Sequence, residues 1–286
     1  MSFAAIPWQV IILVATLLTS LGQIFNKHQV NQAASLQVNF YKYSFSLGLV
    51  FFYWKLSQLG WPSQWLILLF YGFLTGLSVT LYTKASRHSL SKTVLATPAS
   101  QVLEIVLAGI IFSEWQLFAK APQLMLGLVL VPILVWLFYE KNLKSKKWSV
   151  LILGLIFYMA SLNLFAKYSL KQVEPLQLLL VQYIGCVLAV GLGVKVKEHK
   201  FYLGRQFAVI AFGQSMFSSV GTWLYYVGLK KATIAQTTLL RMPVFLLLTT
   251  LFGLYIFKEV KSMTTKKWLG VVVAFGIALI VVTAKH

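Results

Sequence analysis

Long apolar runs recur from one end of the chain to the other, and they constrain the fold more than any other feature. A membrane-spanning helix needs about 20 mainly apolar residues, and runs of about that length are separated here by only short polar breaks. Hydrophobic residues make up 59% of the chain and charged residues only 11%, so a soluble fold would have too little surface to hide its apolar side chains. We therefore predict an all-α integral membrane protein.

Ten stretches of the sequence are long and apolar enough to be spanning helices. The first one lacks the basic start and the small-residue cleavage site of a signal peptide, so we expect it to be retained as a helix. The longest basic connection lies at the middle of the chain. The expected helices are residues 6–26, 36–57, 64–84, 91–113, 122–139, 148–168, 174–194, 205–229, 234–257 and 267–284.

An internal repeat relates the two halves of the chain. Pro98 and Glu114 stand sixteen residues apart, and Pro243 and Glu259 repeat this spacing 145 residues later. A second match supports the same alignment, at a shift of 140 residues. It pairs FNKHQVNQAASLQ, residues 25–37, with FAKYSLKQVEPLQ, residues 165–177. Self-similarity at a fixed shift indicates that both halves are built from the same set of helices.

Each half contains five predicted spans, and this odd number sets the orientation of the second half. After five crossings the chain is on the other side of the bilayer, so the second half is upside down relative to the first. Many secondary transporters have this plan, and their substrates bind near the midplane where the repeats meet. The sequence predicts ten transmembrane helices as two inverted five-helix repeats, residues 1–144 and residues 145–286.

The net charge of +19 does not indicate a nucleic-acid partner, because the basic residues fall in the breaks between apolar runs. Lysines at helix ends anchor a protein to lipid headgroups, so the expected partner of this charge is the lipid bilayer. If the N-terminus were cytoplasmic, the inside breaks would hold seven basic residues and the outside breaks sixteen. The positive-inside rule therefore favours both termini on the outside.

The sequence lacks the groups that catalysis or a cofactor would need. Cys186 is the only cysteine, which excludes an intramolecular disulfide and a cysteine-built metal site. We find no nucleotide-binding loop, no metal-ligand cluster and no nucleophile beside a base. We predict that the protein is not an enzyme, that it needs no cofactor or metal, and that it does not drive transport with ATP by itself.

The fourth predicted span contains Glu104, the only acidic residue deep in an apolar run. A charged side chain at the bilayer centre costs about 2.5–3.5 kcal/mol on insertion scales, and such residues usually mark a substrate or ion path. Thr97 and Gln101 precede Glu104 on the same helix face, next to the break expected at Pro98. We expect all three to bind the substrate. Because burial favours an uncharged carboxyl group, Glu104 is also the candidate for proton coupling.

The ninth predicted span contains Arg241, four residues after Thr237 and close to Pro243. A guanidinium group stays charged, so inside a membrane it needs an anionic partner. Two alternatives are open. Either Glu104 forms an ion pair with Arg241 that locks the two halves together, or Arg241 holds an anionic group of the substrate while Glu104 accepts a proton or a substrate amine.

Four amide side chains lie in other apolar runs and are further candidates to line a cavity, although hydrogen bonds between helices would explain membrane amides equally well. They are Gln23, Asn26, Asn163 and Gln214. Tyr225 and Tyr226, near the end of the eighth span, are expected to be interfacial anchors. Lys42 is expected to extend to the interface, because it lies one or two turns from a helix end.

The repeated motifs resemble those of the drug/metabolite transporter superfamily, in particular its ten-helix EamA-type members. The resemblance rests on the fourth span closing on Phe112, Ser113 and Glu114, on its counterpart closing on residues 257–259, and on the last span, GVVVAFGIALIVVTA. It implies alternating access through a central cavity lined mainly by helices 1, 3, 4, 6, 8 and 9. It also implies cytoplasmic termini, in conflict with the lysine distribution.

From these features we predict a multi-pass secondary transporter of the cell (inner or plasma) membrane that acts as a monomer or a homodimer. Amino acids or related organic anions are the predicted small-molecule substrates, with proton coupling through Glu104. Two alternatives stay open. One is an exporter of organic cations or drugs, in which aromatic faces and Glu104 would hold an ammonium group. The other is a membrane scaffold that transports nothing.

Overall fold

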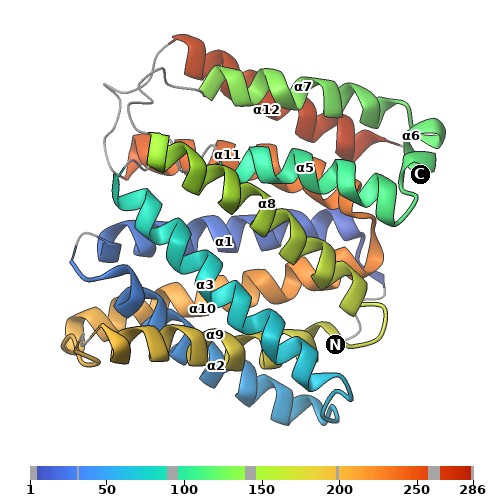
Figure 1. Ribbon diagram of the computed structural model, residues 1–286. Coiled ribbons are helices and arrows are strands. Elements are labelled where there is room, and N and C mark those ends of the chain that lie inside the picture. The colour runs from blue at the N-terminus through green and yellow to red at the C-terminus, as the bar shows by residue number, and fades with distance from the viewer. Residues whose placement is uncertain are drawn as a thin grey trace.

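The protein is helical throughout the part of the chain that the computed structural model describes, namely residues 5–30, 32–88, 96–138, 146–197, 200–256 and 265–284 (Figure 1). The helices in these residues are α1 (Trp8–Val30), α2 (Ser35–Ser57), α3 (Trp65–His88), α5 (Ala96–Ile111), α6 (Trp115–Lys120), α7 (Gln123–Phe138), α8 (Lys146–Ser169), α9 (Pro175–Val196), α10 (Arg205–Lys231), α11 (Ile234–Tyr255) and α12 (Thr265–Thr283).

Each of the ten predicted spans coincides with one of these helices, and the short α6 is the addition. Within the described residues, five helical stretches are long and apolar enough to cross a membrane, judged by length and composition. They are Trp8–Asn26, Trp65–Lys84, Pro175–Val196, Arg205–Lys231 and Ile234–Phe252. These spans confirm the prediction of an all-helical membrane protein.

The helices run between two opposite ends of a bundle (Figure 1). One end, called here the N-end, carries the start of the chain and the α2–α3, α8–α9 and α10–α11 turns, at the right of Figure 1. The α1–α2 and α9–α10 turns lie at the opposite end. The most extensive packing is of α1 along α10 and of α3 along α9, while α5 packs against α8 and α11 packs against α1.

Two glutamines that the repeat aligns make the same pair of hydrogen bonds at the two ends of the bundle. At the start of α2, Gln37 accepts from the Ala34 N–H at 3.0 Å, and its amide donates to the Lys200 carbonyl at 2.7 Å. At the start of α9, Gln177 accepts from the Glu174 N–H at 2.9 Å and donates to the Gly60 carbonyl at 2.7 Å. Each glutamine therefore caps its own helix and ties it to a turn in the other half.

The crossing of α3 and α9 depends on two glycines. A Cβ atom on Gly72 would overlap the backbone of Gln182, and one on Gly185 would overlap the backbone of Leu69. Small residues let membrane helices approach this closely. The Cys186 thiol also donates to the Gly72 carbonyl at 3.2 Å, so α3 and α9 form one tightly packed pair.

The end of α5 has a special backbone conformation. Ser113 adopts a left-handed conformation with φ of 57°, which ends the helical run and places Glu114 beside the start of α11. A non-glycine residue in this region is uncommon and signals a local structural requirement. At its other end, the described part of α5 has Pro98 near its start.

Candidate functional site

Glu104 is the centre of a polar site in which three helices meet. Its side chain is 1% exposed, on α5. One carboxyl oxygen, Oε2, accepts a hydrogen bond from the Asn163 amide on α8 at 2.9 Å, and Oε1 accepts a long one from the Thr238 hydroxyl on α11 at 3.4 Å. The structure therefore brings together Glu104 and Asn163, two of the residues predicted for the site, and adds Thr238 to them.

Arg241 lies one turn after Thr238 on α11 and so belongs to the same side of that helix. The central carbon of its guanidinium is 4.1 Å from the centroid of the Tyr225 ring, which α10 contributes. This is the geometry of a cation–π contact. Arg241 is partly buried, whereas the side chain of Tyr225 is 4% exposed.

In the part of the chain that the structure describes, Glu104 and Arg241 form no ion pair within 4 Å. They are near enough to attract each other electrostatically, but each has its own contacts. Glu104 is held by Asn163 and Thr238, and Arg241 is stacked on Tyr225. The direct ion pair between the two halves, one of the two alternatives from the sequence, is therefore absent from this structure.

We call these five residues, Glu104, Asn163, Tyr225, Thr238 and Arg241, the polar centre. Helices α5, α8, α10 and α11 contribute them. Since α11 begins at the N-end, a rise of 1.5 Å per residue places Thr238 about 6 Å, and Arg241 about 10 Å, inside that end. The polar centre therefore lies nearer to the N-end than to the opposite end.

The remaining predicted residues are distributed around this centre. Gln101, one turn before Glu104, is 6% exposed, and its Oε1 atom has no hydrogen-bond partner. Gln214 on α10 is 2% exposed, and its Oε1 is likewise unpaired. On α1, the Asn26 amide donates to Gln23 Oε1 at 3.3 Å, so these two residues contact each other. The side chain of Thr97 lies outside the described residues.

Sequence reasoning missed two members of the polar centre. Tyr225 and Tyr226 were expected at the membrane interface, but their side chains are 4% and 3% exposed and lie inside the bundle, so that expectation was wrong. Thr238 was overlooked in favour of Thr237, whose hydroxyl bonds only to backbone carbonyls of its own helix end. The spacing of three between Thr238 and Arg241 was a usable signal.

A second buried network adjoins the polar centre through Tyr226. The Tyr226 hydroxyl donates to Gln182 Oε1 at 2.9 Å and lies 3.1 Å from the Tyr71 hydroxyl, to which the Gln182 amide donates at 3.4 Å. Phe165 of α8 stacks on Tyr71 with 5.0 Å between the ring centroids. The three polar groups satisfy one another, so this network stabilises the packing of α3, α9 and α10.

Lys42 of α2 is partly buried, and its Nζ lies 5.3 Å from the centroid of the Tyr43 ring. Its backbone carbonyl accepts a hydrogen bond from the Ser215 hydroxyl of α10 at 2.8 Å. The cation therefore contacts an aromatic face.

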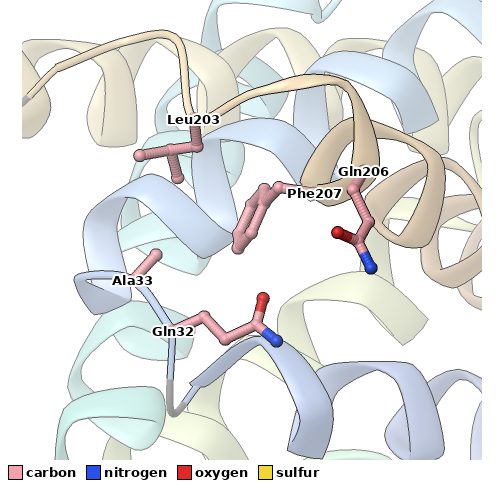
Figure 2. A pocket seen from close by; sticks show the side chains of 5 residues that line it. All are labelled: Gln32, Ala33, Leu203, Gln206 and Phe207. Carbon is pink, nitrogen blue, oxygen red and sulfur yellow. The ribbon is translucent and has the colours of Figure 1, made fainter.

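The structure also has a surface hollow of about 250 Å³ at the end opposite the N-end (Figure 2). The α1–α2 turn and the start of α10 line it, with Gln32, Ala33, Leu203, Gln206 and Phe207 (Figure 2). None of these is a residue of the polar centre, so the hollow is a separate feature of the surface.

Comparison with known proteins agrees with this architecture. One solved structure, described only as the crystal structure of a protein, superposes with a TM-score of 0.78 and covers 98% of this chain and 99% of its own. Its sequence identity is 10%, so the likeness concerns the fold alone. No curated protein matches the sequence.

The model of the EamA-like transporter family matches residues 146–283, a segment that includes Asn163, Tyr225, Thr238 and Arg241. The family is one of membrane transporters. This match confirms the resemblance inferred from the repeated motifs. The second half of the chain is therefore similar to the EamA-like transporter family, a part of the drug/metabolite transporter superfamily.

Proposed function

We propose that the chain is a ten-helix secondary transporter that moves small polar metabolites, amino acids or related organic anions, by alternating access. The similarity of the second half to the EamA-like transporter family supports transport in general, and the polar centre supports this class of substrate. On this proposal the protein is a multi-pass component of the cell membrane, works as a monomer or a homodimer, and performs no catalysis.

The contacts between helices support an inverted repeat with halves at residues 1–144 and 145–286. Gln37 and Gln177 make matching hydrogen bonds at opposite ends of the bundle, and the acceptor carbonyls of Lys200 and Gly60 differ by the same shift of 140 residues. Packing of α5 on α8 also corresponds to packing of α11 on α1 when the halves are exchanged. An inverted repeat would produce both pairs of matching contacts.

The main support for this substrate class comes from the surroundings of Arg241. Its guanidinium is permanently charged, lies inside the bundle on the ring of Tyr225, and has no carboxylate partner within 4 Å among the described residues. A planar guanidinium can bind a carboxylate by two parallel hydrogen bonds. An anionic group of the substrate would supply the partner that the described residues do not provide.

Glu104 gives the proposed site its second charge. The carboxyl group of Glu104 is held by Asn163 and Thr238 and not by Arg241. The polar centre therefore contains one acidic group and one cation that are not paired with each other. An amino acid carries the complementary pair, with its carboxylate directed to Arg241 and its ammonium group to Glu104. Protonation of Glu104 would remove its attraction for the ammonium group, which is how a proton could be coupled to substrate release.

The substrate class can be tested by thermal unfolding of the purified protein in the presence of candidate ligands. A ligand that binds the folded state alone stabilises it by about 2.7 kcal/mol at one hundred times its Kd. We expect amino acids or organic anions to raise the unfolding temperature, and their amides or esters, which lack the carboxylate, to have no effect. Stabilisation by quaternary ammonium compounds alone would favour the exporter of organic cations instead.

A further inference from the structure

The turn between α10 and α11 is held by a lysine from another helix. Lys167, near the end of α8, donates two hydrogen bonds from its Nζ, to the Leu229 carbonyl at 2.6 Å and to the Ala232 carbonyl at 2.7 Å. These carbonyls belong to the last turn of α10 and to the residue after it. The last carbonyls of a helix have no N–H partner within that helix. A cation at a helix C-terminus also interacts favourably with the helix dipole.

The same turn is held from its other side by a glutamate. Glu114, which follows the left-handed Ser113 at the end of α5, accepts hydrogen bonds from the Ile234 and Ala235 N–H groups, both at 3.0 Å. Those N–H groups are the first of α11 and have no partner inside that helix. Lys167 and Glu114 also attract each other across the turn. One turn is thus fixed by opposite charges from α8 and α5.

The ion pair between Lys230 and Glu174, which also lies at the N-end, is weaker because it is exposed to water. Lys230 pairs with Glu174 at 2.7 Å, but the two side chains are 39% and 52% exposed, and water screens such a pair. Glu114 is only 7% exposed, so its hydrogen bonds are protected from water. The contacts of Glu114 with this turn are therefore stronger than the exposed Lys230–Glu174 pair.

This pair lies directly next to the polar centre. Lys167 is one turn after Asn163 on the same side of α8, which separates them by about 6 Å along the helix. Thr238 is likewise one turn after Ile234, which Glu114 caps. The four helices that form the polar centre are therefore the four that Lys167 and Glu114 tie together at the nearer end of the bundle.

We propose that Lys167 and Glu114 form a latch that closes the polar centre toward the N-end, and that release of this latch opens the transport path at that end. The proposal rests on the proposed function, since it assigns a gate to that transporter. Release separates the α10–α11 turn from the ends of α5 and α8 and exposes the first turn of α11 to water. Alternating access needs such an element, because both ends must not be open together.

The latch can be tested by thiol labelling without any substrate. Thr237→Cys in a Cys186→Ala background places a reporter in the first turn of α11, where Thr237 is 0% exposed. An impermeant thiol reagent is applied to intact cells and to inverted vesicles, and exposed Ser57→Cys marks the preparation in which the N-end faces the reagent. From that side we expect slow labelling of the reporter in the parent, and labelling at least tenfold faster with Lys167→Met.

Matched variants separate the latch from general loosening. Lys171→Met removes a nearby lysine whose Nζ lies over the Phe112 ring at 5.0 Å, and it should leave the labelling rate unchanged. If Lys167→Met does not fold, Glu114→Gln replaces it, because the amide keeps an acceptor but loses the charge, and labelling should still accelerate. Equal rates in the parent and in the folded latch variant would overturn the proposal, as would equal acceleration by Lys171→Met. A failure of substrate uptake would count against the proposed function and not against these rates.

Discussion

Replacing Arg241 by glutamine distinguishes a structural role of this cation from a role in binding. If Glu104 were its obligatory partner, Arg241→Gln would leave a buried carboxylate unpaired and would cost about 3–5 kcal/mol of stability. The structure instead gives Glu104 the Asn163 and Thr238 donors and gives Arg241 the Tyr225 ring. The substitution then removes the contact of Arg241 with Tyr225 from the unliganded protein, which is worth about 2 kcal/mol for a desolvated cation–π pair.

The substitution should also weaken ligand binding. A hydrogen bond to a charged group contributes about 1.5–3 kcal/mol, and at about 1.4 kcal/mol per tenfold change this weakens the Kd for a carboxylate ligand by roughly 10- to 150-fold. Thermal unfolding of the unliganded protein measures the stability, and titration with the best ligand from the screen measures the affinity. Lys171→Gln is the matched control, because it removes an exposed cation that lies over an aromatic ring outside the polar centre, and it should change neither quantity much.

The reasoning would be refuted by the opposite pattern. Arg241→Gln would then destabilise the unliganded protein by several kcal/mol, a second substitution, Glu104→Gln, would restore the original stability, and ligand affinity would be unchanged. That result would mean that the two charges depend on each other and not on a substrate.

Five other substitutions test separate parts of the account. Glu104→Gln should flatten the pH dependence of substrate flux while the protein stays folded, and an unchanged pH profile would exclude proton coupling through this residue. Glu114→Ala leaves two buried N–H groups without an acceptor and should destabilise the protein by about 1–3 kcal/mol in thermal unfolding. Gly72→Ala should lower the free energy of unfolding by about 1–3 kcal/mol, because its Cβ meets the α9 backbone. Gly154→Ala, with open space around it, should leave the stability unchanged or raise it slightly. Lys144→Cys, in a loop outside the described residues, should resist an impermeant thiol reagent in intact cells of a cysteine-free variant, and ready labelling would restore the orientation expected from the family.

The helices were predictable because long apolar runs have one structural solution in a bilayer. The structure departs from the predicted spans mainly at their ends and in the additional short helix α6. The shift of 140 residues also identified Gln37 and Gln177 as equivalent, and they make equivalent hydrogen bonds. Such capping is local and therefore readable from sequence.

The polar centre was predictable only in part. Glu104 and Arg241 stand out because charge inside an apolar run is costly and rare. Their partners depend on how α5, α8, α10 and α11 are rotated against one another, and that is a property of tertiary packing. Tyr225 illustrates this limit, since a tyrosine near a helix end is typical of the interface, yet here it is buried under a guanidinium.

Uptake by liposomes that contain only the purified protein tests the central claim most directly. The labelled substrate should be the amino acid or organic anion that stabilises the protein most in thermal unfolding. The account predicts saturable uptake that unlabelled substrate competes away and that Arg241→Gln strongly reduces, while Lys171→Gln retains it. Liposomes with folded, ligand-binding protein that accumulate no more substrate than protein-free liposomes would contradict the claim that this chain is a transporter.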